Sequence, residues 1–335
     1  MKSRLEISRR NFLASSGAGL AALSLAGPSW ASSFPSRPIN VTIATGEGGG
    51  ADRDSRAFAS IWNKHLGANF EFGFFPGASG QVGYEHYLQR VEPDPHNLMS
   101  SYIGPEMIML TLQAPDIRPG EDFVYFQQFV EEPMAVYVGA DSEIETIEQL
   151  IDLGRQRTVN VSKSRLPHPA SICMLSMAEA TGIDVNLVPF GGGNPASMAV
   201  IGGEVDCCAL PVSVPISLGD QVRILAVFAD TNPVPAATGD APTANDALDL
   251  DLPPLTSARS WAIHRETIEQ FPEEVEIIRE TARQTAEDPE FVEAMAEVGV
   301  PSEFVSAGGE DVAMAAAEAT AELAERYRDL LTGDD

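Results

Sequence analysis

Short apolar runs alternate along this chain with segments of helical periodicity, and turn-forming glycines separate them. Residues 39–44 have the pattern of a strand, a glycine cluster follows, and residues 54–66 place apolar side chains at helical spacing. The pattern recurs twice more, at 70–75 with 82–91 and at 98–102 with 106–112. Strands that alternate with helices in this way predict a parallel α/β sheet, whose ligands bind beyond the carboxyl ends of the strands.

A second α/β series follows the first and predicts two lobes. Its expected strands and helices are 123–130, 134–138, 144–155, 158–162, 170–181, 185–189, 196–201, 205–210, 212–218 and 223–229. A chain of this length is longer than a single hydrophobic core usually supports. We assign residues 32–130 and 226–335 to lobe I and residues 131–225 to lobe II, joined by two crossing segments. The expected C-terminal helices, 273–286, 289–298 and 310–331, pack on lobe I.

The first 31 residues have the pattern of an export signal. Arg9 and Arg10 precede an apolar run, and small residues around Ala31 suit a signal peptidase. The alternative is a membrane anchor, but the run is shorter than the ~20 residues that span a bilayer. We therefore expect a twin-arginine signal peptide over residues 1–31 and a periplasmic mature protein. The expected cleavage site contains no cysteine, so the sequence does not indicate a lipid anchor.

The charge balance excludes several classes of partner. The chain has 49 Asp and Glu against 21 Lys and Arg, and removal of residues 1–31 leaves a net charge near −31. Such a surface repels nucleic acid and anionic lipid. Only three of the basic residues are lysines, so strong acidity with little lysine favours a halophilic setting, in which salt screens the self-repulsion. Acidic tails could produce a similar total, but here the acid is spread along the chain.

Three cysteines are compatible with at most one disulfide. Cys207 and Cys208 are adjacent in the sequence, so a bridge from one of them to Cys173 is the single option. The alternative is that all three are small buried apolar groups.

Two glycine-rich loops follow the first two predicted strands. Gly48, Gly49 and Gly50 let the backbone turn closely before a helix whose N-terminus favours an anion. In the alternative interpretation the glycines only make a turn and Asp52 caps the helix. The segment with Ala78, Ser79 and Gly80 repeats the arrangement one strand later. Two such loops at one sheet edge predict a carboxylate site made largely of backbone N–H groups.

Four motifs together resemble the substrate-binding proteins of tripartite tricarboxylate transporters. They are residues 34–39, 48–56 and 76–83, and the pair 189–193 with 201–206, in the order and spacing of that family. The resemblance implies a two-lobed periplasmic-binding-protein fold (Venus-flytrap, type II) with two crossing strands. It also implies a small carboxylate ligand and a membrane permease with large and small subunits as partner. The expected protein is a monomer that needs no cofactor and no metal.

The resemblance also assigns site residues. Residues 48–50 and Asp52 match the first family loop that holds the carboxylate, and residues 76–80 match the second. Gly191, Gly192 and Gly193 match the loop that brings lobe II to the ligand. Glu47 stands where the family commonly has proline. A carboxylate there would repel an anionic ligand by on the order of 1 kcal/mol.

Side chains of lobe II are candidates for a second carboxyl group. Ser162, Lys163 and Arg165 follow a predicted strand and bring positive charge into an acidic protein. The alternative is a solvated surface loop. Ser101, at the end of the third predicted strand, adds a hydroxyl that could contact the ligand.

Two other functional classes remain as alternatives. An exported enzyme is the main rival, but the chain lacks a Gly-x-Ser-x-Gly elbow, a His-Glu-x-x-His pair, a Cys-x-x-Cys pair and a nucleotide-binding loop. A sensor subunit that presents its ligand to a membrane receptor would share the fold and differ only in its partner. The sequence leaves open which carboxylate binds, how many carboxyl groups are recognised, and whether a cation accompanies it.

Overall fold

The computed structural model describes residues 34–252 and 255–332, so the predicted signal peptide lies outside the described residues. The strands are β1 (Ile39–Ile43), β2 (Phe70–Phe74), β3 (Asn97–Tyr102), β4 (Phe123–Gly139), β5 (Val159–Lys163), β6 (Val185–Pro189), β7 (Cys207–Pro211), β8 (Val222–Phe228) and β9 (Thr256–His264). The helices of the first half are α2 (Gly50–Leu66), α3 (Gln81–Arg90), α4 (Ile103–Gln113), α5 (Ile147–Gly154) and α6 (Pro169–Thr181). Those of the second half are α7 (Gly193–Ile201), α8 (Ser213–Leu218), α9 (Ala244–Leu248), α10 (Arg265–Gln270), α11 (Pro272–Ala286), α12 (Pro289–Glu297), α13 (Glu310–Arg326) and α14 (Arg328–Thr332).

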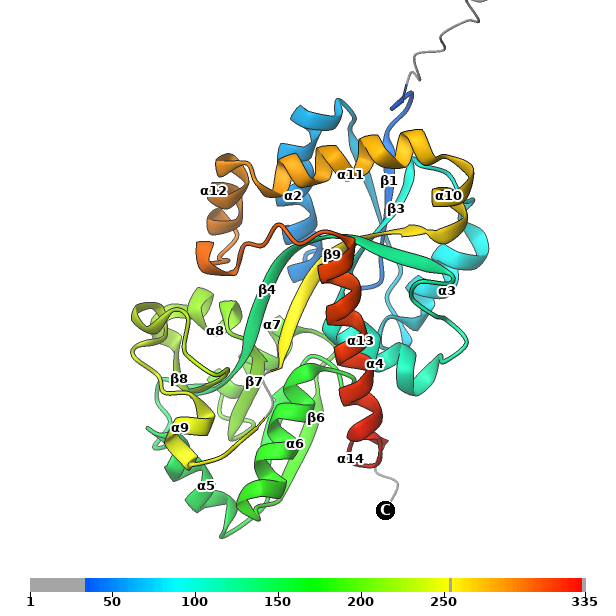
Figure 1. Cartoon of the computed structure of the whole chain (residues 1–335). Coiled ribbons are helices and arrows are strands. Elements are labelled where there is room, and N and C mark those ends of the chain that lie inside the picture. The colour runs from blue at the N-terminus through cyan, green and yellow to red at the C-terminus, as the bar shows by residue number, and fades with distance from the viewer. Residues whose placement is uncertain (1–33, 253–254, 333–335) are drawn as a thin grey trace, which may run out of the picture.

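Two groups of strands share the long strand β4. The order is β2-β1-β3-β9-β4-β7-β5-β6, and β8 also pairs with β4. The first half of β4 pairs with β9 as far as Pro133, and from Met134 onward it pairs with β7 and β8. Since Pro133 has no N–H to donate, the change of partner falls where a ladder is weakest. Figure 1 shows β4 and β9 running between the two lobes.

The crossing strands differ from the sequence prediction in two ways. The expected strands 123–130 and 134–138 form one continuous strand, and β9 had not been predicted as a strand. Both run antiparallel to their neighbours, whereas β1, β2 and β3 are mutually parallel, as are β5, β6 and β7. The two-lobed periplasmic-binding architecture is confirmed, but its sheet is mixed rather than wholly parallel.

The predicted lobe boundary at residues 225 and 226 falls inside β8. All seven residues of β8 belong to one strand on the lobe II side of β4, and α9 packs against β8 and α5. The chain therefore returns to lobe I just before Thr256, where β9 begins. Composition did not show this because the connector after β8 is polar and rich in proline, which is also typical of an interlobe linker.

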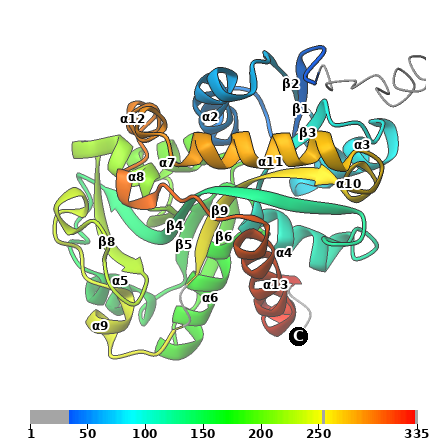
Figure 2. The same ribbon diagram turned by 45° about the horizontal axis from the view of Figure 1, so that its top comes forward.

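Helices cover both faces of the lobe I strands. On one face α2, α11 and α12 pack around the buried rings of Phe58, Trp62 and Trp261; Phe58 and Trp62 stand edge to face with centroids 5.4 Å apart. On the other face lie α3, α4 and α13 (Figure 2). In lobe II, α5 and α6 cover β4, β5 and β7. Within the part of the chain that the structure describes, no helix is both long enough and apolar enough to cross a membrane.

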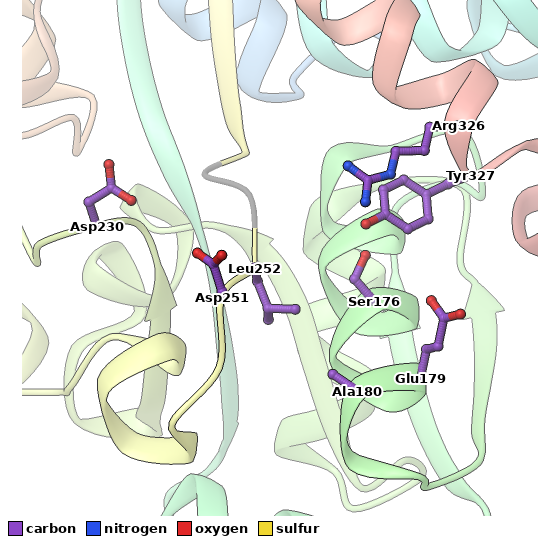
Figure 3. A pocket seen from close by; sticks show the side chains of 8 residues that line it. All are labelled: Ser176, Glu179, Ala180, Asp230, Asp251, Leu252, Arg326 and Tyr327. Atoms are coloured by element: carbon purple, nitrogen blue, oxygen red, sulfur yellow. The ribbon is translucent and has the colours of Figure 1, made fainter.

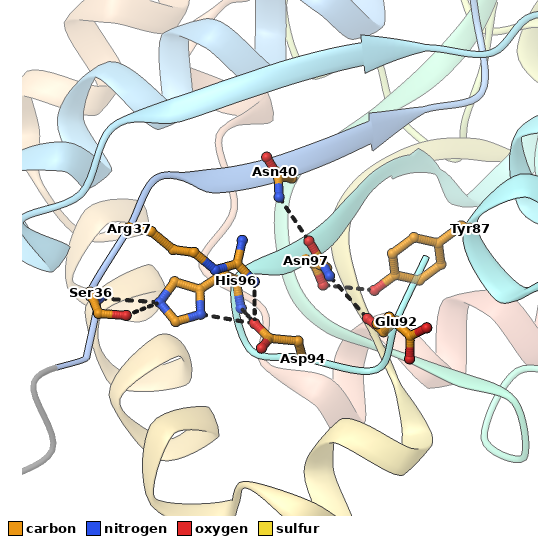
Figure 4. A network of polar contacts seen from close by, with 8 residues as sticks. All are labelled: Ser36, Arg37, Asn40, Tyr87, Glu92, Asp94, His96 and Asn97. Atoms are coloured by element: carbon orange, nitrogen blue, oxygen red, sulfur yellow. Dashed lines mark hydrogen bonds and ion pairs between the residues drawn. The ribbon is translucent and has the colours of Figure 1, made fainter. Parts of the chain in front are cut away.

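The amino ends of β1 and β3 are tied together by a polar network, shown in Figure 4. His96 accepts a hydrogen bond from Ser36 N–H through Nε2 (3.2 Å), and its Nδ1 lies 2.8 Å from Asp94. Arg37 donates to the same carboxylate at 2.9 Å. This network fixes the start of the described chain against the sheet, at the end opposite to the glycine loops.

The three cysteines are free and buried. Of the two alternatives left open by the sequence, the structure therefore has small buried groups and no disulfide.

Candidate functional site

The predicted ligand loops of lobe I lie at one edge of the sheet. Because β2, β1 and β3 are adjacent and parallel, their carboxyl ends meet there. The residues that follow them are Gly46–Asp52 after β1, Pro76–Gly80 after β2, and the start of α4 after β3. The structure thus brings together three loops that are far apart in the sequence.

The first loop is braced by its own carboxylate. Gly48 has φ +76° and donates its N–H to Asp52 Oδ2 at 2.9 Å. Asp52 is buried and also pairs with Arg56 at 2.5 Å, so it holds the loop rather than pointing outward. Gly49 precedes α2 and no side chain caps this helix end, which leaves first-turn N–H groups for a guest.

A buried hydroxyl next to this loop had not been predicted. Thr45 follows β1, and its Oγ1 has no hydrogen-bond partner among the described residues. A buried polar atom without a partner costs free energy unless something binds it. Thr45 is therefore an additional candidate contact; the sequence offered no signal for it, since a threonine beside a glycine cluster is common in turns.

The second loop holds four consecutive residues with positive φ. The angles are +138° at Gly77, +45° at Ala78, +59° at Ser79 and +113° at Gly80. Left-handed backbone is strained at the two residues that carry a Cβ, and such strain persists where the surroundings enforce it, commonly at functional sites. The helix α3 begins directly afterwards and also lacks a side-chain cap. This geometry accounts for glycine at Gly80, where a Cβ would lie 3.2 Å from Arg165.

Ser101 belongs to a buried network centred on Glu106. Its hydroxyl donates to Glu106 at 2.5 Å, and Tyr84 donates to the same carboxylate at 2.8 Å. The Tyr84 and Tyr125 hydroxyls are 2.7 Å apart. Burial raises the pKa of Glu106, and the nearby charge of Arg165 together with the two hydroxyls lowers it in part. Glu106 was missed from the sequence because a single glutamate in a predicted helix is usually on the surface.

The lobe II candidates lie at the carboxyl ends of parallel strands β5 and β6. Ser162 is fully buried and donates to the carbonyl of Ala196 at 2.8 Å. Lys163 is also 0% exposed, and burial lowers its pKa to about 7. The carbonyl of Lys163 accepts from Phe190 N–H at 2.9 Å, which places the third glycine loop beside it. Both side chains are thus interior, unlike the solvated loop considered as an alternative.

The third glycine loop resembles the first. Gly191 has φ +75°, and Gly192 precedes α7 without a side-chain cap on the helix. Gly193 is the first residue of α7.

Arg165 joins the two lobes. Its Nη1 donates to the carbonyl of Ser79 at 2.6 Å, and its Nη2 lies 3.7 Å from Glu106 Oε1. A residue that follows β5 therefore contacts the strained loop that follows β2, so the two sheet edges face each other. The pairing could not be predicted, since both partners depend on how the lobes pack.

A buried charge network lies at the crossing strands. Arg259 on β9 pairs with Asp54 on α2 and, at 2.7 Å, with Glu132 on β4. Its guanidinium also stacks over Tyr102, 4.8 Å from the ring centroid. Burial alone would lower the pKa of Arg259, but the two carboxylates and Tyr102 raise it well above its ordinary value. The Tyr102 hydroxyl lies 2.8 Å from where a Cβ of Gly50 would be, so the network supports the first loop.

A cavity of about 510 Å³ lies elsewhere, between α6, the connector from β8 to β9, and the C-terminal end of α13 (Figure 3). Three carboxylates and one arginine line it, together with Ser176, Ala180, Leu252 and Tyr327; the charged residues are Glu179, Asp230, Asp251 and Arg326. The excess of negative charge makes it unsuited to an anion. The glycine loops remain the better candidate site for a carboxylate.

A family model and several known proteins match this chain. The family model matches residues 56–321, and the family is described as "Tripartite tricarboxylate transporter family receptor". The match begins just after the first glycine loop. Over 176 residues the chain is 27% identical to the UPF0065 protein in the TAR-I ttuE-ttuC′ intergenic region of Agrobacterium vitis. That match covers 52% of this chain and 51% of the relative, so the chain spans about half the length of the relative.

Solved structures share the fold at low identity. MatC from Rhodopseudomonas palustris with bound malate has a TM-score of 0.72 and 20% identity over 89% of this chain and all of that one. An R. palustris protein with adipate has a TM-score of 0.74 and 19% identity over 87% and 98% of the two chains. The family and the fold are those of solute-binding proteins, not of enzymes. Since the family match spans most of the chain, this protein belongs to the tripartite tricarboxylate transporter receptor family.

Proposed function

We propose that this protein captures a small organic carboxylate outside the cytoplasmic membrane and delivers it to the large and small subunits of a tripartite tricarboxylate permease. The observation that carries the proposal is the strained loop Gly77–Gly80, held at the sheet edge that faces lobe II. Two uncapped helix N-termini, those of α2 and α3, lie at the same edge. Backbone donors and helix dipoles suit a carboxylate.

The family and the similar structures with malate and adipate support a carboxylate as the ligand class. Twin-arginine export is predicted from Arg9 and Arg10. It would bring the mature chain to the compartment in which a binding protein delivers its ligand to such a permease. The glycines of all three loops, together with Thr45, are the proposed contacts. Asp52 holds the first loop in shape.

The test is loss of ligand-induced stabilisation in Gly80→Val. A β-branched residue resists φ +113° and would collide with Arg165, so the loop would no longer present its donors. Melting temperatures are measured with and without millimolar malate, adipate, 3-hydroxybutyrate and hexanoate, since a ligand of the native state raises the melting temperature. We expect a shift in the native protein for at least one acid and none for Gly80→Val.

The control is Gly67→Val. Gly67 also has a positive φ, +76°, but it caps the C-terminus of α2 at the opposite side of lobe I, and a Cβ added there would have no other atom within 4 Å. Both variants are strained, yet only Gly80→Val changes the site. An equal ligand-induced shift in both would place the ligand away from the second loop.

A further inference from the structure

One face of helix α4 is turned toward lobe II, although α4 follows β3 in lobe I. Ile108 on this face is fully buried in the apolar cluster of lobe II, and Leu112 packs against the same cluster. Gly104 lies four residues before Ile108, so it is on the same face of the helix. Because α4 also contacts α6 of lobe II, these two helices form a direct junction between the lobes.

Gly104 marks a close approach within this junction. A Cβ at this position would lie 2.6 Å from Cγ of Pro169, the first residue of α6, and 3.2 Å from the carbonyl oxygen of Thr256, where β9 begins. Neither obstacle can swing aside, because one belongs to a ring closed onto the backbone and the other is the backbone itself. Even the methyl group of an alanine would therefore require α4 and α6 to move apart.

The backbone conformation of Gly104 does not explain why glycine is present. Its φ is not positive, so an alanine could adopt the same helical conformation. Glycine also favours a helix less than alanine does. The close approach of Pro169 is therefore the physical reason for glycine at this position.

The junction lies beside the loops that face each other across the two sheet edges. Pro169 comes four residues after Arg165, whose guanidinium donates to the carbonyl of Ser79 in the second loop at 2.6 Å. Glu106, two residues after Gly104, lies 3.7 Å from the same guanidinium. A longer distance between α4 and α6 would separate these groups, and with them the glycine loops of the two lobes.

We propose that Gly104 is a positioning residue for ligand capture. Its missing side chain lets α6 of lobe II approach α4 closely enough for the glycine loops of both lobes to contact one ligand. In this role Gly104 acts on the distance between the lobes and not on the ligand, so a larger residue should weaken the binding of every acid by the same factor. This inference rests on the proposed function and concerns how the same site is assembled.

The test is Gly104→Ala, measured in two ways. Calorimetric titration uses malate, adipate, 3-hydroxybutyrate and hexanoate, and each acid that binds the native protein should bind the variant at least about tenfold more weakly. Hydrogen–deuterium exchange without added acid follows segments 77–81 and 165–171 on the two sides of the junction, and both should exchange faster in the variant.

The two measurements separate the inference from the proposed function. Undiminished affinity in Gly104→Ala overturns the inference and leaves the proposed function intact. If none of the four acids binds the native protein, the proposed function fails, and the inference then stands or falls with the faster exchange.

A second substitution across the junction identifies the obstacle. Pro169→Ala removes the ring atom that would lie 2.6 Å from the added Cβ. Gly104→Ala combined with Pro169→Ala should therefore bind each acid within about threefold of Pro169→Ala alone. A loss caused only by damage to α4 would not be relieved by a change in the other lobe. A double variant as weak as Gly104→Ala overturns the inference.

Gly154→Ala is the matched control. Gly154 also lies in a helix, α5, without a positive φ, and a Cβ there would lie 2.8 Å from Ile183. Both residues belong to lobe II, so the strain stays within one lobe. We expect a lower melting temperature for Gly154→Ala and unchanged affinities. An equal loss of affinity in this control would mean that strain of any kind weakens binding, which contradicts the role proposed for Gly104.

Discussion

At the scale of single residues, Lys163 makes the stability of this protein depend on pH. Its pKa is about 7 in the folded protein and 10.5 in an exposed lysine. Between these values the unfolded chain binds more protons than the folded one, so stability rises with pH. We expect a gain of about 2 kcal/mol from pH 7 to pH 9 relative to Lys163→Met, measured by urea unfolding.

Lys64→Met is the control for this prediction. Lys64 is half-exposed and pairs with Glu290 at the surface. The free energy of unfolding of Lys64→Met should therefore depend on pH in the same way as that of the native protein. Parallel profiles for the native protein and Lys163→Met would show that the amine is not buried in solution.

At the scale of elements, the network around Arg259 connects α2 with both crossing strands. Removal of one member of a buried charge group leaves the others unpaired, which typically costs about 3–5 kcal/mol. Arg259→Met leaves Asp54 and Glu132 buried without their cation. We expect a loss of this size in the free energy of unfolding, measured by urea titration.

Arg265→Met tests whether position in the network matters. Arg265 begins α10, is partly exposed, and pairs only with Glu269 on its own helix among the described residues. Its loss should change stability by less than about 0.5 kcal/mol. Equal effects of the two variants would mean that the network contributes nothing beyond a surface pair.

At the scale of the whole molecule, the net charge of −28 should make the fold salt-dependent. In molar salt the screening length falls to about 3 Å, so repulsion between surface carboxylates is suppressed. We expect the melting temperature to be higher in 2 M than in 0.05 M sodium chloride. Sucrose, which carries no charge, is the control for general solute effects. A flat or falling melting temperature would contradict the halophilic interpretation and leave the fold unaffected.

Local pattern predicted most of the elements. The expected strand 185–189 coincides with β6, and helix 170–181 differs from α6 by one residue. Such segments are predictable because their apolar spacing and their flanking turn residues act over a few positions. The glycine loops were visible for the same reason, since positive φ is a local demand: Gly48, Gly80 and Gly191 all have it.

The sequence by itself therefore determined the α/β class, the two-lobed family and the loops on which a carboxylate is proposed to bind. Only the tertiary structure decided which charges are free. Arg165 and Glu106 are 59 positions apart in the sequence, and Arg259 and Asp54 are further apart still, yet each pair is in contact. Whether a cation is available to a ligand depends on such long-range contacts and on burial, and no local pattern carries that information.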